Sequence, residues 1–582
     1  MLKALIAFGE LKGEFMKKDM KNKIDKGVAE KPERVVKKGF EKTAAVDDVG
    51  RKGIIDGEFI DKALETLKKY KEGKTSLEKR IVENEQWFKM RHWDNIQGSE
   101  GNENSSAWLF NSIANKHADA MDNYPAVSCL PREESDRKAA QILSQILPVV
   151  FERNGFEKIY SDAWWYKLKA GTAVYGVFWN PLKSNGLGDI EIKQVDILNI
   201  FWEPGIKDIQ KSKSLFHVEL INNDTLLSMY PFLSGKLGSS NIEISKYVYD
   251  DTVDTSEKSA VIDMYYKIIK NGAQYVHYCK ICNGELLYAS ENDPLYLERG
   301  FYDHGKYPFV FDTLFVEEGT PCGFGYIDIM KDAQKQIDML GNALVRNAAM
   351  ATNPRYFINS SGAVNEEEFA DWTNNFVHVS GSNLGEDSIR EIKLSGIPEV
   401  YLGILNGKID ELKETSGNRD FSQGGVSSGV TAASAIAALQ EAGGKLTRDM
   451  VKGGYRAFAD LNKLAVELVR QFYDEPRFFR IVGPNGNEEF IAYDNTEIRV
   501  RNQGVEFGVE VGTRKPVFDI KVCAEKASPF SKISQNELAL QLYNSGFFNP
   551  EMRSQALIAI GMMDFESKEN VISRISNGGV IL

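Results

Sequence analysis

Apolar residues return every three or four positions through a first patterned stretch of the sequence, which begins near Phe59. This spacing places them on one face of a helix, so the stretch predicts amphipathic helices. After residue 171 they alternate with polar residues instead, which is typical of half-buried strands. The predicted helices cover residues 60–69, 77–91, 107–121 and 134–154, and the predicted strands cover residues 172–179, 190–195, 214–220, 261–270 and 274–282. Asn283-Gly284 after the last strand is a strong hairpin-turn signal. A mixed helix and strand domain is therefore expected.

One helical pattern is much longer than the others and runs from Gly325 to Met350. At ~1.5 Å per residue it would span about 39 Å, and Pro354 ends it because its ring disfavours a helical residue before it. Its apolar side is formed by Tyr326, Met330, Ala333, Ile337, Leu340, Leu344 and Ala348. Its polar side is formed by Asp328, Lys331, Lys335, Asp338, Asn342 and Arg346. In a single chain, a polar side of this kind is expected to face bulk solvent.

A small region with Ser- and Gly-rich turns follows over residues 355–395, and a second helix is predicted from Pro398 to about Lys413. Residues 416–430 contain four glycines and four serines, a composition typical of a flexible loop. The next helix is long, and its two glycine pairs each predict a bend. This helix covers residues 431–473, and its glycine pairs are at 443–444 and 453–454. Strands are predicted after it at 478–481, 497–501 and 517–522. Short helices are predicted between 535 and 575.

Charge is distributed unevenly along the 582 residues, although the net charge is −12. The first 52 residues hold 14 Lys and Arg against 9 Asp and Glu and lack sustained periodicity, which predicts a basic, mobile N-terminal arm. The remaining chain carries 57 against 74, or −17. An acidic body argues against a broad face that grips the phosphate backbone of nucleic acid, but it does not exclude a protein through which DNA slides.

Composition limits the cellular setting as well. No apolar run approaches the roughly 18 residues needed to cross a bilayer, and the first eight residues are too short an apolar stretch for a secretory signal. Five scattered cysteines do not form a disulfide framework in a chain this long, so we expect reduced thiols. We therefore expect a soluble protein made in a cytoplasm.

The motifs that carry chemistry are few. Gly73-Lys74-Thr75 is similar to the end of a phosphate-binding loop, but Lys68 stands where that loop needs its first glycine, so a solvated helix is the favoured interpretation. Cys279 and Cys282, with His277 upstream, have the spacing of a metal or redox pair, yet no partner pair follows. Two buried cysteines on opposite faces of a strand are favoured, and metal binding stays open. We predict no catalytic residues, no cofactor and no enzyme activity.

The order of the elements resembles the portal protein, or head-to-tail connector, of tailed double-stranded DNA bacteriophages. A mixed domain leads into a long helix, a small insert, a second helix, a Gly/Ser loop and a long broken helix that returns to strands. The resemblance extends over residues 77–573, and no single motif carries it. The matching segments are residues 84–93, 170–176, 196–204, 323–347 and 428–431.

The resemblance implies an α+β, portal-like subunit. In the family's terms it would have a wing of mixed helices and strands, a two-helix stem, a small clip, a tunnel loop and a helical crown. The implied divisions are an N-terminal arm (1–58), the first part of the wing (59–322), stem helix 1 (323–353), the clip (354–397), stem helix 2 (398–415), the tunnel loop (416–431), the long kinked helix (432–475), the C-terminal wing strands (476–528) and the crown-like region (529–582). The arm is longer than the family needs.

The function implied by the resemblance is a ring at one capsid vertex through which DNA is packaged and ejected. The implied partners are other copies of the chain in a cyclic homo-oligomer, a dodecamer in the capsid, together with double-stranded DNA, the terminase packaging motor, a head-tail adaptor, and the major capsid and scaffolding proteins, with no membrane. The polar side of the long helix would then face the channel or its rim. The tunnel loop would line the narrowest point of the DNA channel with Arg419, Gln423, Gly424, Gly425, Ser427 and Ser428. Arg419 and Gln423 would make transient phosphate contacts there, and the glycines would allow the loop to rearrange.

Two other functions stay open on the sequence alone. One is a DNA-processing enzyme whose site is assembled from carboxylates far apart in the sequence. The other is a monomeric scaffold or adaptor protein of the virion. A ring with a central hole in negative-stain images would favour the portal, whereas a compact monomer with metal-dependent nuclease activity would favour the enzyme.

Overall fold

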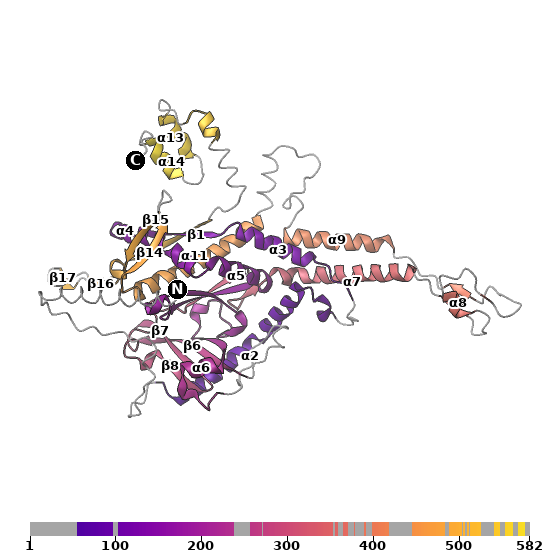
Figure 1. Ribbon diagram of the computed structural model, residues 1–582, viewed down its shortest axis with the longest axis horizontal. Helices are drawn as coiled ribbons and strands as arrows, with labels where there is room; N and C mark the ends of the chain where they lie inside the picture. The colour runs from indigo at the N-terminus through magenta and orange to yellow at the C-terminus, as the bar shows by residue number, and fades with distance from the viewer. Residues whose placement is uncertain are drawn as a thin grey trace, which may run out of the picture. The chain divides into compact units, whose positions relative to one another are not determined.

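The computed structural model has a mixed architecture of helices and antiparallel strands, as the sequence predicts (Figure 1). Both classes of element are present through most of the chain, which makes the fold α+β. The structure describes residues 55–96, 103–237, 257–270, 272–352, 356–358, 365–370, 378, 389–391, 398–417, 445–482, 488–502, 505–506, 509–510, 513–524, 540–547, 553–562 and 568–576. Nearly all of the predicted N-terminal arm, residues 1–58, lies outside these ranges.

The first described helix, α2 (Gly57–Phe88), is continuous where the sequence predicts two shorter helices. Asp56 caps it by accepting a hydrogen bond from the backbone N–H of Phe59. The prediction of two helices was wrong. It rested on the polar residues between the two stretches, which interrupt the apolar pattern but do not end the helix. Lys74 and Glu78 nevertheless lie on the buried side of α2, in line with Tyr70 and Ile81.

Three further helices build the centre of the protein. The predicted helices at 107–121 and 134–154 are confirmed as α3 (Trp108–Met121) and α4 (Arg137–Arg153). The helix between α4 and the first predicted strands, α5 (Phe156–Ala170), was not predicted from the sequence. It contacts α2, α3, α4 and α7 as well as the sheet, and Trp164 and Leu168 are fully buried.

Two antiparallel sheets account for most of the predicted strands. In the larger sheet β4 (Ile200–Trp202), β5 (Ser214–Asn222), β6 (Lys258–Lys270), β7 (Ala273–Cys282) and β8 (Glu285–Ala289) pair in sequence order. In the smaller sheet β2 (Thr172–Asn180) lies between β3 (Asp189–Val195) and β9 (Phe309–Thr313). The hairpin predicted at Asn283-Gly284 is confirmed, because both residues have positive φ in the turn between β7 and β8.

Helix α11 (Lys445–Phe472) packs against β2, β9 and β20 (Phe518–Ala524) and is the described part of the predicted long helix. It continues through Gly453 and Gly454 without interruption. A Cβ atom at Gly454 would lie 2.9 Å from Cζ2 of Trp164, so this glycine permits close packing of α11 on α5. The other predicted bend, at residues 443–444, lies outside the described residues.

The remaining strands form small antiparallel pairs. The unpredicted β1 (Pro125–Pro131) pairs with β20, so a segment before α4 and one late in the chain share a ladder. The strand predicted at 478–481 is confirmed as β14 (Arg477–Val482), which pairs with β15 (Glu488–Tyr493). The strand predicted at 497–501 was wrong, since Asn495–Glu497 forms a short 3-10 helix. Four short strands complete these pairs: β16 (Arg501–Asn502), β17 (Val505–Glu506), β18 (Val509–Glu510) and β19 (Thr513–Arg514).

The two predicted helices around the small insert are confirmed as α7 (Tyr326–Thr352) and α9 (Glu399–Ser416). The described part of the insert contains β12 (Tyr356–Ile358), α8 (Glu366–Ala370) and β13 (Ile389–Glu391). β12 and β13 pair antiparallel, so the start and the end of the insert are held together. Other short elements are α6 (Asn223–Met229), β10 (Phe315–Val316), β11 (Gly323–Phe324), α13 (Arg553–Met562) and α14 (Lys568–Ser576).

Candidate functional site

Helices α7 and α9 pack against each other along their lengths and connect the small insert to the rest of the chain (Figure 1). One side of α7 is buried up to Asp338, but none of its residues from 339 onward is buried. In α9 only Leu412 and Ser416 are buried. The pair therefore leaves large apolar side chains exposed: Ile329, Met339, Val345, Met350, Val400, Tyr401, Leu402 and Ile404.

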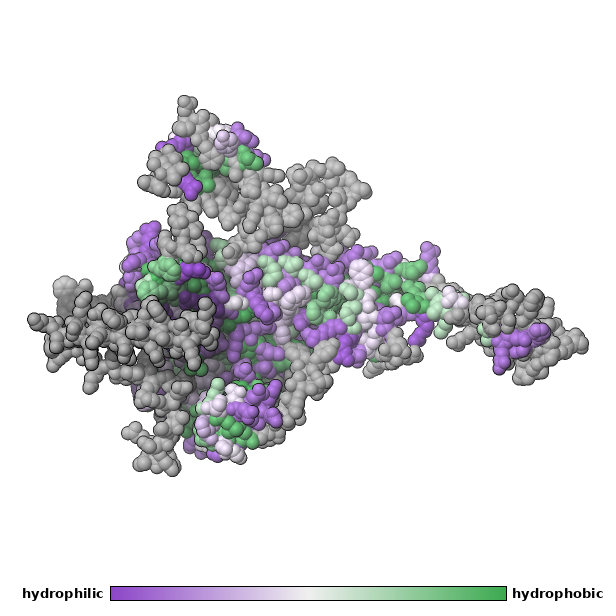
Figure 2. All heavy atoms as spheres, viewed as in Figure 1, coloured by the Kyte–Doolittle hydropathy of each residue, from purple (hydrophilic) through white to green (hydrophobic). Residues whose placement is uncertain are grey.

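The exposed apolar residues form part of a mixed surface, and hydrophobic patches are visible along α7 and α9 in Figure 2. Single exposed apolar residues are normal in soluble proteins, but clusters of this kind mark interaction surfaces. Val400, Tyr401, Leu402 and Ile404 fall within five consecutive residues at the start of α9. This part of the pair is the strongest candidate in the described chain for contact with another protein surface.

The polar side predicted for α7 is only partly directed to solvent. Asp338 is 2% exposed and Asp328 accepts a hydrogen bond from Asn84 in α2, at 3.0 Å. Asn342 donates to the carbonyl of Asn104 at 2.7 Å. The interpretation of Asp328 and Asp338 as facing solvent or a channel was therefore wrong, because both side chains pack against earlier segments of the same chain, whereas Asn342 stays partly exposed.

A buried polar cluster surrounds Asp338. Its Oδ2 lies 2.5 Å from Nδ1 of His92, and its Oδ1 accepts hydrogen bonds from the N–H and the hydroxyl of Ser106 at 2.8 and 2.7 Å. Gln334 donates to the same oxygen at 3.0 Å and accepts from the N–H of Leu109 at 2.9 Å. Sequence reasoning missed this cluster. The available signal was the polar pair Gln334 and Asp338, four positions apart on a helix face that is otherwise buried.

The residues predicted to line the DNA channel, Arg419, Gln423, Gly424, Gly425, Ser427 and Ser428, all lie outside the described residues. The structure does describe both ends of that segment. Gly417 ends α9 with φ +69°, and a Cβ placed on it would lie 3.3 Å from Cδ1 of Leu446 in α11. The chain therefore leaves α9 and enters α11 at nearly the same point.

This junction is anchored on α3. Nζ of Lys116 donates to the hydroxyl of Thr447 at 3.1 Å, and that hydroxyl donates to Asp119 at 3.0 Å. Burial lowers the pKa of Lys116, while the neighbouring Asp119 carboxylate opposes this shift. Residues 418–444 thus connect two fixed points that share one support.

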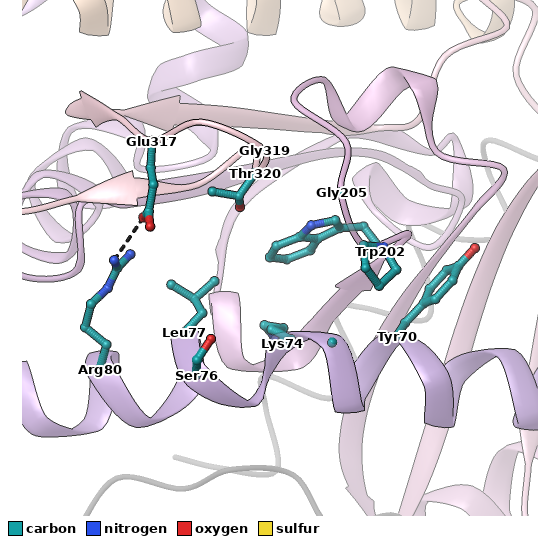
Figure 3. A pocket seen from close by; sticks show the side chains of 12 residues that line it. Tyr70, Lys74, Ser76, Leu77, Arg80, Trp202, Gly205, Glu317, Gly319 and Thr320 are labelled. Atoms are coloured by element: carbon teal, nitrogen blue, oxygen red, sulfur yellow. Dashed lines mark hydrogen bonds and ion pairs between the residues drawn. The ribbon is translucent and has the colours of Figure 1, made fainter.

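A pocket of about 380 Å³ lies between α2 and two loops (Figure 3). Tyr70, Gly73, Lys74, Ser76, Leu77 and Arg80 line it from α2, Trp202, Pro204 and Gly205 from the loop after β4, and Glu317, Gly319 and Thr320 from the loop between β10 and β11. Figure 3 shows Lys74 beneath the Trp202 ring and Arg80 paired with Glu317. The lining combines cationic, hydroxyl and aromatic groups.

The cations of this pocket are engaged by the chain itself. Nζ of Lys74 donates to the carbonyls of Ile197 and Ile200 at 2.5 and 2.8 Å and lies 4.3 Å from the centre of the Phe201 ring. Burial lowers the pKa of Lys74 to about 8. Arg80 donates to Glu317 and to the carbonyl of Gly323. Lys74 is thus a buried anchor inside a helix and neither a phosphate-loop lysine nor a solvated one.

The cysteine pair is explained by packing. Cys279 and Cys282 lie on β7 and belong to different apolar clusters, which confirms that they face opposite sides of the strand. Burial raises the pKa of Cys279 to about 12, so its thiol is protonated at neutral pH. Within the described ranges, no three His, Cys, Asp or Glu side chains gather as a metal site. No described helix is long and apolar enough to span a bilayer.

The described residues thus combine a helix pair, a small insert between its helices and an exposed apolar surface on the pair. The chain matches the model of the phage P22-like portal protein family over residues 112–581. Because the match spans most of the chain, the protein belongs to this family. No curated protein matches the chain.

Family membership confirms the resemblance predicted from the order of elements and decides between the functions left open above. The protein is a phage portal protein, a virion component that serves in DNA packaging and as the connection between head and tail. The family is structural, and it implies a position at a capsid vertex with DNA, terminase and capsid proteins as partners.

Proposed function

We propose that the chain assembles into a closed ring, dodecameric in the capsid, through which double-stranded DNA is packaged and ejected. In this ring α7 and α9 are the stem helices (323–353 and 398–415), residues 59–322 and 476–528 form the wing, 354–397 the clip, 432–475 the long helix and 529–582 the crown. Neighbouring subunits make heterologous contacts through their wings and stems. The observation that carries the proposal is the apolar surface of the α7–α9 pair, which a single chain leaves to solvent.

The acidic body suits a passage for DNA. Tight contacts between clustered cations and phosphates would hold a duplex in place, whereas an acidic lining repels it weakly everywhere. The −17 charge outside the first 52 residues supports this passage model. The work of translocation comes from the terminase motor.

Residues 416–431 form the tunnel loop in this proposal, with Arg419 and Gln423 making transient phosphate contacts and Gly424, Gly425, Ser427 and Ser428 allowing rearrangement. The contact between Gly417 and the α11 residue Leu446 supports it. The segment that contains this loop, residues 418–444, has both of its ends at the Gly417–Leu446 contact, so it can extend toward a duplex without displacing α9 or the described part of α11.

The clip is the docking surface for the terminase motor and later for the head-tail adaptor. Two features of the insert support this role. Both of its ends join the α7–α9 pair, and β12 and β13 pair at its base. The major capsid and scaffolding proteins are further partners of the ring in this proposal. No cofactor is needed for any of these roles.

The ring is tested with the full chain, purified without other phage proteins. Native mass spectrometry and negative-stain images over a concentration series should show a closed oligomer with a central hole. Monomers alone at the highest concentration, with no ring in the images, would contradict the proposal.

A further inference from the structure

Helix α3 lies against both α9 and α11, the two helices that residues 418–444 connect. In its first turn, the ring centre of Trp108 lies 5.5 Å from Nζ of Lys413 in α9. Just beyond its end, the carbonyl of Asn123 accepts a hydrogen bond from the hydroxyl of Tyr455 in α11, at 3.0 Å. α3 is therefore a common support of both helices.

Lys116, in the second half of α3, is a buried cation at this junction, and its side chain is 4% exposed. Nζ lies 3.7 Å from the position that a Cβ atom on Gly417 would take, so the ammonium group is next to the C-terminal end of α9. The last carbonyls of a helix lack intrahelical partners and carry partial negative charge, which favours a cation there. Lys116 is therefore placed to stabilise the end of α9.

The same ammonium group reaches the first described turn of α11. Nζ of Lys116 donates to the hydroxyl of Thr447 at 3.1 Å, and that hydroxyl donates to Asp119 at 3.0 Å. Asp119 lies three positions after Lys116, and its Oδ2 is 3.6 Å from Nζ. Because a hydroxyl can accept one hydrogen bond and donate another, Thr447 satisfies both charged groups of α3 at once.

Burial makes these contacts more important than those of an exposed ion pair. A charge removed from water is unfavourable unless it is paired and hydrogen-bonded, whereas exposed pairs contribute little to stability. If α9 and α11 moved apart, Lys116 would keep Asp119 but lose either Thr447 or the end of α9. Separation of the two helices is therefore opposed at this point.

We propose that Lys116, Asp119 and Thr447 form an anchor that holds the end of α9 beside the first described turn of α11 and thereby positions residues 418–444. These are positioning residues, which act on DNA through the segment that they hold. The effect on DNA rests on the proposed function, because that function assigns residues 416–431 to the tunnel loop. The relative position of the two helices belongs to the single chain and can be measured without DNA.

Pulsed electron paramagnetic resonance of the full chain measures this position directly. Spin labels are attached through Thr415→Cys and Asp449→Cys, two exposed positions, in a Cys523→Ser background, because Cys523 is exposed and the other four cysteines are buried. Labelled chains are mixed with an excess of unlabelled chains before assembly, so that distances within one chain dominate. The parent should give one narrow distance distribution. Lys116→Met should lose it, because the substitution removes the ammonium group and keeps an unbranched apolar side chain.

Further variants separate the hydrogen bonds from packing. Thr447→Val keeps the shape of the side chain without its hydroxyl and should also broaden the distribution, whereas Thr447→Ser keeps the hydroxyl and should match the parent. Lys158→Met is the matched control, because it makes the same change at a lysine that is 82% exposed and pairs with Asp162. A second pair of labels at the exposed positions Asp224 and Ile269 should be unchanged in every variant, which shows that the body is folded.

Retention of DNA in filled heads separates this inference from the proposed function. A narrow distribution in Thr447→Val, or equal broadening in Thr447→Val and Thr447→Ser, overturns the anchor even if Lys116→Met fails to fold. Broadening in Thr447→Val alone of these two, together with reduced DNA retention, supports both the anchor and the tunnel loop. The same broadening with DNA retention equal to that of the parent supports the anchor and contradicts the assignment of the tunnel loop.

Discussion

Replacing Leu402 by glutamate should prevent ring assembly while leaving the subunit folded. Leu402 is 47% exposed and lies in the first turn of α9, whose N-terminal residue is Glu399. A carboxylate near a helix N-terminus is favourable, so the helix itself does not oppose the substitution. The expected effect therefore falls on the surface that α9 presents to a neighbouring subunit.

The size of the effect follows from the exposed area. Fully burying a leucine side chain contributes about 1.5–3 kcal/mol, so burying the half of Leu402 that is still exposed contributes about 1 kcal/mol at each interface. Leu402→Ala should therefore weaken each interface by about fivefold. Leu402→Glu additionally buries an unpaired charge, which costs several kcal/mol and should raise the dissociation constant by roughly 1000-fold or more.

The assay is mass photometry of parent and variants at matched concentrations, with circular dichroism to show that the subunit is folded. Leu402→Ala is the matched comparison, because it removes the apolar side chain without adding a charge, and it should weaken assembly far less than Leu402→Glu does. Rings of Leu402→Glu at the concentration at which the parent assembles would refute the reasoning.

Deleting residues 362–385 should leave rings intact and abolish terminase binding in a pull-down, and full binding would exclude the clip as the docking surface. Arg419→Glu should lower DNA packaging and retention in intact rings. The effect should be larger at low salt, because charges then act beyond the ~8 Å over which they are screened at physiological ionic strength. Packaging equal to that of the parent at all salt concentrations would place the loop away from DNA. Gly454→Ala should lower the free energy of unfolding by about 1–3 kcal/mol in chemical denaturation, since its Cβ would meet Trp164 at 2.9 Å. Gly453→Ala should instead raise the free energy of unfolding by about 1 kcal/mol, because the added Cβ would meet only the end of Arg456, at 3.8 Å. Equal effects of the two substitutions would count against close packing as the reason for Gly454.

The helix pair could be predicted from the sequence because each helix has a sustained period and a proline at a boundary. Pro354 follows the end of α7, and Pro398 is the residue before α9. Helix α5 was missed although its buried residues Phe156, Tyr160, Trp164 and Leu168 recur every four positions. Lys167 on the buried side and the half-buried Trp165 on another side blur the division into an apolar and a polar face.

The buried cluster of α7 shows a different limit of sequence reasoning. Asp338 was assigned to a polar side because its neighbours in the pattern are charged, and its partners His92 and Ser106 are more than 200 residues earlier. Pattern along a helix cannot reveal which distant side chain meets it. The cysteines at 279 and 282 were interpreted correctly, because alternation along a strand alone puts them on opposite faces. The tunnel-loop residues stay a prediction.

The contact between Gly417 and Leu446 has a consequence for how this protein can vary. For a loop closed between two fixed points, doubling its length costs only about 0.6 kcal/mol, and neither anchoring helix has to move. Insertions and deletions between residues 418 and 444 are therefore compatible with the same α9 and α11. A protein that keeps this junction can therefore change the length of the connecting segment independently of the two helices.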